Sequence, residues 1–73
     1  MCIGERAEVV AGLAALGRRD VELGLTHLVD AVRVADPAVK DDLRAALLGV
    51  FAELGEHHPL AVRFRRRLAQ ALY

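Results

Sequence analysis

The sequence predicts an all-α domain of four antiparallel helices, arranged as two stacked helical hairpins. Three breaks, "GRRD" at 17–20, "ADP" at 35–37 and "GEHHP" at 55–59, separate four stretches with helical composition and apolar period. Alternation of β-branched residues, which is typical of strands, is absent. Because the connections are short, neighbouring helices are expected to run antiparallel. A chain of 73 residues is expected to form a single domain spanning 1–73.

The first helix is predicted over 5–16. Its apolar residues are expected on or near one face, and they are Ala7, Val10, Ala11, Ala14 and Ala15, with Leu13 and Leu16 beside them. Gly12 weakens the middle by ~1 kcal/mol relative to alanine. We interpret this glycine as room for another backbone to approach closely.

The second helix is predicted over 21–34, with Asp20 as its N-cap. The third is predicted over 37–54, because Asp36 and Pro37 form a start signal and Gly55 a stop signal. This third helix has the longest apolar stripe and is expected to be the centre of the core. The stripe consists of Val39, Leu43, Ala46, Leu47, Val50, Phe51 and Leu54.

The fourth helix is predicted over 59–72, with His58 as a poor N-cap. One face is apolar, and it consists of Leu60, Phe64, Leu68, Ala71 and Leu72. The opposite face carries Arg63, Arg66, Arg67 and Gln70, whereas Arg65 points elsewhere.

Composition and charge exclude several classes of protein. Ten basic residues balance ten acidic ones, which argues against a polyanion binder. No charge-free apolar run approaches the ~20 residues of a membrane span. The start "MCIGER" does not resemble a secretory signal, so a cytoplasmic location is expected. The single cysteine, Cys2, rules out an internal disulfide and a CxxC motif.

Catalytic and metal-binding patterns are also absent, so we expect no enzyme, no cofactor and no metal. The chain has no serine, and Thr26 is its only threonine. Asp41 and Asp42 are adjacent, so on a helix they point about 100° apart. His57 and His58 have no further ligands at zinc spacing, and we expect the histidines to cap or to face solvent.

The first half resembles a tetratricopeptide repeat, in the stretch "GLAALGRRDVELGLTHLVDAVRVADP". The matching positions are Gly12, Gly24, Leu28, Ala31 and Pro37. The sequence departs from the repeat at the turn, where Arg19 stands in place of the glycine. The closing proline falls one residue late, and the tryptophan and tyrosine of the first helix are missing. Such a repeat normally needs neighbours.

The second half, "LRAALLGVFAELGEHHPLAVRFRRRLAQALY", is similar to the extreme C-terminus of bacterial thioredoxin-like co-chaperones with a tetratricopeptide tail. The matching residues are Leu47, Phe51, Leu54, Gly55, Pro59, Ala61, Val62, Arg66, Arg67, Leu68, Ala71, Leu72 and Tyr73. Together the two resemblances cover about 10–73. They imply a non-catalytic protein-binding module that holds unfolded clients or docks on the chaperonin. The chain has no thioredoxin domain, so no redox role is expected.

The residues expected to bind a protein partner are Arg63, Arg66, Arg67, Leu68, Leu72 and Tyr73. Two alternatives remain for the arginines: a solvated face paired with acids of the third helix, such as Asp41 or Glu53, or a nucleic-acid site. The terminal "ALY" could instead close the core.

A self-assembling bundle is the other alternative for the whole chain. Val9, Val10, Leu13 and Leu16 place apolar residues on more than one side of the first helix. An exposed strip there is expected to pair with a second copy, which would give a homodimer.

Overall fold

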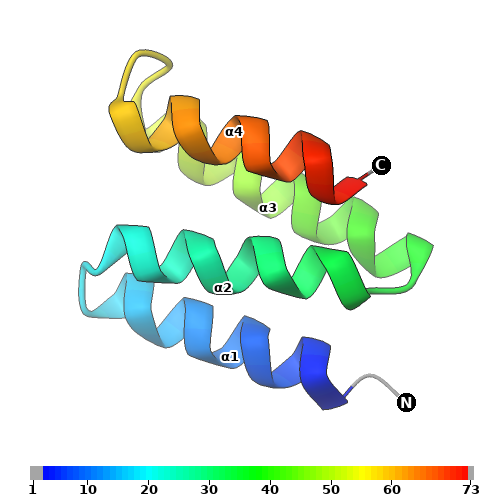
Figure 1. The fold of residues 1–73 in the computed structure, drawn as a ribbon. Helices are drawn as coiled ribbons and strands as arrows, with labels where there is room; N and C mark the ends of the chain where they lie inside the picture. The colour runs from blue at the N-terminus through cyan, green and yellow to red at the C-terminus, as the bar shows by residue number, and fades with distance from the viewer. Residues whose placement is uncertain (1–2, 73) are drawn as a thin grey trace.

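The computed structural model describes residues 3–72 and, for side chains, residues 6–72. It contains α1 (Ile3–Gly17), α2 (Val21–Val34), α3 (Pro37–Leu54) and α4 (Pro59–Leu72), and these residues include no strand. Figure 1 shows the α1–α2 hairpin beside the α3–α4 hairpin, with α2 between α1 and the second hairpin. The predicted all-α fold of stacked hairpins is therefore confirmed. The fold is flat, with extents of 36 × 27 × 14 Å.

Helices α2, α3 and α4 begin and end where the sequence predicts, whereas α1 is longer than the predicted 5–16 at both ends. Asp20 caps α2 by accepting a hydrogen bond from the Leu23 backbone N–H at 3.4 Å. Gly55 ends α3 with a positive φ of 102°, and its N–H donates to the Phe51 carbonyl. His58 is a better cap than expected, because its Nδ1 accepts the Leu60 backbone N–H at 3.1 Å.

The centre of the core is α2, not α3 as the sequence suggested. Within the described residues α2 packs against all three other helices, whereas α1 packs against α2 only. The long stripe of α3 is only partly covered, since Ala46 is exposed and Val39 and Val50 are half-buried. The buried cluster consists of Leu25, Leu28, Val29, Ala31, Val32 and Ala35 from the second helix and its end, Leu43, Leu47 and Phe51 from the third, and Ala61, Phe64 and Leu68 from the fourth.

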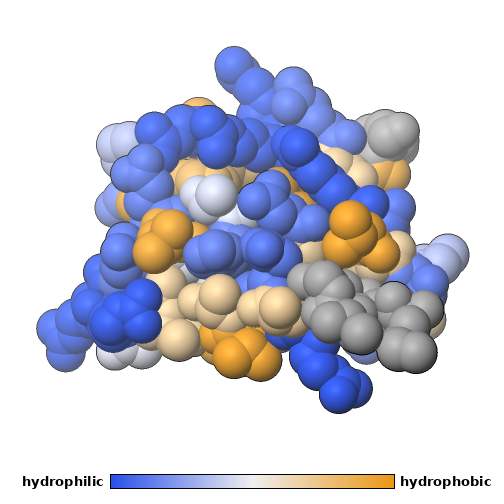
Figure 2. Space-filling model, turned by 60° about the horizontal axis from the view of Figure 1, so that its bottom comes forward, coloured by the Kyte–Doolittle hydropathy of each residue, from blue (hydrophilic) through white to orange (hydrophobic). Residues whose placement is uncertain are grey.

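The buried face of α1 also differs from the expected one. Gly12 and Ala15 are buried against α2, but Ala7, Val10 and Ala14 are exposed. The close approach at the glycine decides which side of α1 turns inward, and the alanine pattern alone did not reveal it. Figure 2, which looks at the α1 side of the molecule, shows apolar atoms at this surface.

Two glycines set the distance between α1 and α2. A Cβ on Gly12 would lie 2.9 Å from Leu28 Cγ and 3.1 Å from the Gly24 carbonyl oxygen. A Cβ on Gly24 would lie 2.7 Å from Leu16 Cγ and 3.0 Å from the Gly12 carbonyl oxygen. Each helix thus carries a glycine followed four residues later by the leucine that covers the other helix's glycine. The interpretation of Gly12 as a close-approach site is confirmed.

The turn between α1 and α2 places Arg19 in the left-handed region, with φ 65°. The Asp20 N–H donates to the Ala15 carbonyl at 2.8 Å, and the Arg19 N–H donates to the Leu16 carbonyl at 2.9 Å. These two bonds form a Schellman motif, whose left-handed position is usually glycine. Arg19 therefore holds a conformation that costs an L-residue roughly 1–2 kcal/mol.

Replacing Gly24 by alanine should destabilise the protein, although alanine favours helix. The new methyl group would force α1 and α2 apart, and overpacking of this kind costs about 1–3 kcal/mol. The matched control is Gly49→Ala in α3, where a Cβ meets nothing within 4 Å and helix propensity predicts a gain of up to ~1 kcal/mol. Urea unfolding of both variants measures the difference, and equal effects would contradict the close packing.

Replacing Arg19 by glycine should stabilise the protein by about 0.5–1 kcal/mol, because released backbone strain exceeds the entropic cost of glycine. Arg18→Gly is the control, since Arg18 has no positive φ and should lose stability instead. Thermal unfolding followed by circular dichroism compares the two. A loss of stability in both variants would mean that Arg19 carries no strain.

Candidate functional site

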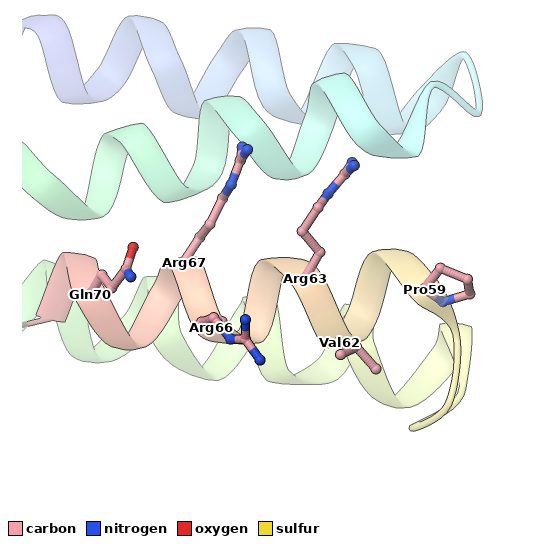
Figure 3. A pocket seen from close by; sticks show the side chains of 6 residues that line it. All are labelled: Pro59, Val62, Arg63, Arg66, Arg67 and Gln70. Atoms are coloured by element: carbon pink, nitrogen blue, oxygen red, sulfur yellow. The ribbon is translucent and has the colours of Figure 1, made fainter.

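Helix α4 carries four arginines and no acidic residue. Arg63 and Arg67 are four residues apart, so they lie on the same side of the helix. Figure 3 shows both side chains reaching from α4 toward α2, whereas Arg66 does not. The sequence placed Arg63, Arg66 and Arg67 together, and the structure divides them between the α2 side and the outer side.

Arg63 forms an ion pair with Glu22 of α2, with 2.8 Å between Nη2 and Oε2. The two side chains are 47% and 61% exposed, so the pair contributes at most ~1 kcal/mol to stability. The expected acids of the third helix, Asp41 and Glu53, are not the partners. The partner is set by tertiary packing, because the side of α4 that carries Arg63 lies beside α2 rather than α3.

Buried aromatic rings hold three of the four guanidinium groups. Cζ of Arg63 lies 5.0 Å from the Phe64 ring centroid, and Cζ of Arg67 lies 5.1 Å from it. Arg65 lies 5.8 Å from the Phe51 ring. Both rings are buried, and the three guanidinium groups lie over them at the distance of a cation–π contact. These contacts favour the side-chain directions seen in the structure.

The described residues provide no ion-pair partner for Arg66 or Arg67. Both side chains are exposed. With Arg63 they surround a shallow hollow on the surface of α4, whose other lining residues are Pro59, Val62 and Gln70. We call this hollow and its six residues the arginine face.

The predicted apolar residues of the site are only partly available. Leu68 is 3% exposed and belongs to the core, so its side chain presents nothing to a partner. Leu72 is half-buried against the core, and Tyr73 lies outside the described residues. Val62, which the sequence reading left out of the site, is 49% exposed beside the arginines. The signal was present, since Val62 precedes Arg63 and lies off the apolar stripe.

Two of the three histidines, His27 and His58, make structural contacts. His27 Nδ1 lies 2.7 Å from Glu8 Oε2 and ties α2 to α1, which the sequence did not reveal. His58 caps α4, and His57 is exposed. The side chains described, those of residues 6–72, include no group of three or more His, Cys, Asp or Glu suited to a metal ion. Nor does any helix among them have the length and apolar character of a membrane span.

Comparison with known proteins gives one match. The family model described as tetratricopeptide repeat matches residues 5–73, which includes both hairpins. No curated protein and no solved structure matches the chain. Repeats of this family generally mediate protein–protein interaction and are typically non-catalytic. The match agrees with the resemblance of the first hairpin and extends it over the second.

Proposed function

Because the chain belongs to the tetratricopeptide repeat family, we propose that it is a non-catalytic protein-binding module that docks its partner on the arginine face of α4. The observation that carries this proposal is the position of the arginines around one surface hollow. Arg63 and Arg67 are held over Phe64, and Arg66 and Arg67 have no acid among the described residues. Arg67 combines both properties, and an oriented charge without an internal partner favours fast and correctly registered association.

The partner we propose is the chaperonin or an unfolded client, in the cytoplasm. This proposal rests on the similarity of 47–73 to the tail of thioredoxin-like co-chaperones. The apolar part of the contact would come from Val62 and Leu72 of α4 and from Tyr73, the residue that follows Leu72 in the sequence. Leu68 supports the same helix from inside, because its burial fixes α4 against α2 and α3.

Charge reversal on the arginine face tests the docking. Arg66→Glu combined with Arg67→Glu should reduce binding to purified chaperonin at least tenfold in biolayer interferometry. The reason is that an attraction between the arginines and acidic groups of the partner becomes a repulsion between like charges. The fold should survive, since both side chains are exposed. The control is Arg6→Glu in α1 with Arg18→Glu in the turn that follows it, which changes the net charge equally at the α1 end of the molecule. Helix α1 does not touch α4.

Point variants are needed because truncation before Leu68 would remove a buried core residue. Circular dichroism should show unchanged helicity for both double variants. If the α1 variant loses binding as much as the α4 variant, net charge rather than the arginine face controls the contact. If the α4 variant still binds fully, the docking surface lies elsewhere.

A second candidate function, a self-assembling homodimer, is favoured by the outer surface of α1. Val10 is 62% exposed and Leu13 is 58% exposed. Residues 9–17 contain no polar side chain, yet within the described chain α1 packs against α2 only. Val9 and Leu16 pack against the core, so the unpaired strip is narrower than the sequence suggested. A helix that is apolar all round is normally covered on both sides.

Sedimentation equilibrium over a range of concentrations tests the dimer. The intact chain should dimerise, and Val10→Glu with Leu13→Gln should shift it to monomer, because burial of a charge opposes association. Val34→Glu with Leu48→Gln is the control, since these side chains are exposed on other helices. If the intact chain stays monomeric at high micromolar concentration, the homodimer hypothesis is wrong.

A further inference from the structure

Charge is segregated along this chain although its net charge is zero. Helix α4 carries four arginines and no acid, a net charge of +4. The rest of the chain therefore has six basic and ten acidic residues, a net charge of −4. A surface divided in this way attracts an acidic partner to one helix and repels it from the others.

We propose that the partner of the arginine face is an acidic segment of a protein, and that Glu22 of α2 is a built-in competitor for it. This inference rests on the proposed function of the arginine face as a docking surface. The Glu22 carboxylate at 2.8 Å from Arg63 is an internal example of the group that the face accepts. The guanidinium fork suits carboxylates, and Arg66 and Arg67 leave two further forks open among the described residues.

A protein segment fits the face better than a nucleic acid does. Base stacking needs exposed aromatic rings, but Phe51 and Phe64, the aromatic residues within 6–72, are 0% and 1% exposed. The remaining surface, with its net charge of −4, opposes a long polyphosphate. Pro59 and Val62 lie beside Arg63 and Arg66 in the hollow, so an apolar side chain next to a carboxylate has contacts for both groups.

Glu22 can exchange with a partner's carboxylate at low cost. Its side chain is 61% exposed, and its Arg63 pair is of the exposed kind whose strength is at most ~1 kcal/mol. The Thr26 hydroxyl donates to the Glu22 backbone carbonyl, so this local contact does not depend on the carboxylate. Arg63 also lies over the Phe64 ring, a contact that does not involve Glu22. While Glu22 occupies Arg63, only the unpaired fraction of molecules offers the full face, which lowers the apparent affinity.

Fluorescence anisotropy with a defined probe tests the inference. The probe is a short fluorescein-labelled peptide of Glu, Leu and Ala, with Glu at every fourth position so that the carboxylates share one helix face. Glu22→Gln should bind it more tightly, by up to about fivefold, which is the fold-change of an exposed ion pair. Asp30→Asn removes the same charge from an exposed position of the same helix and should have a much smaller effect. Arg66→Gln with Arg67→Gln should weaken binding about tenfold or more.

Three results would overturn the inference. Equal tightening by Glu22→Gln and Asp30→Asn would make the effect one of net charge and remove Glu22 as a competitor. If a matched peptide with Gln in place of Glu binds as tightly as the Glu peptide, the face does not select an acidic partner. Tighter binding of a thymine oligonucleotide, dependent on Arg66 and Arg67, would replace the acidic segment by nucleic acid. If chaperonin binding still depends on the arginine face in any of these cases, the proposed function survives and only the partner chemistry fails.

Discussion

The packing of α2 against three neighbours is the constraint on which the rest of the structure depends. One side of α2 meets α1 at the glycine crossing, where Gly24 lies against Gly12. The other side carries leucine and valine residues into the core shared with α3 and α4. Glu22 and His27, which lie outside the buried stripe, add an ion pair with α4 and a polar side-chain contact with α1. Helix α2 therefore joins the two hairpins, with glycine on the side that meets α1 and leucine and valine on the side that meets α3 and α4.

The sequence predicts where the helices begin and end better than it predicts which helix faces pack together. Asp20, Pro37 and Gly55 act within one turn of the chain, so their capping and stop signals can be read locally. The inward side of α1 depends instead on a backbone approach between two helices. The Arg63 partner depends on which helix lies beside α4. These contacts between helices form only when the chain packs into its tertiary structure. The spacing of apolar residues along a single helix therefore does not predict them.

In the candidate site, too, some features can be predicted from the sequence and others depend on packing. The cluster of arginines is visible in the sequence, and so is its position on one helix. The burial of Leu68 is not, because the apolar stripe of α4 reads equally well as a core face or as a docking face. The Phe64 ring explains why Arg63 and Arg67 have two roles. Their guanidinium groups lie over this buried ring and so contribute to the fold, while both side chains remain exposed to a partner.

The attachment of α1 through a single neighbour has a consequence for the dynamics of the protein. Sub-global opening is expected to begin with an element that has few buried apolar side chains. Helix α1 has α2 as its one neighbour among the described helices, and within residues 6–17 only Gly12 and Ala15 are fully buried. Its backbone amides should therefore exchange with solvent at a lower free energy than those of α2 or α4. The open form would retain the three-helix core of α2, α3 and α4. It would also uncover the strip of α2 around Gly24 and Leu28, an apolar surface that the closed fold hides.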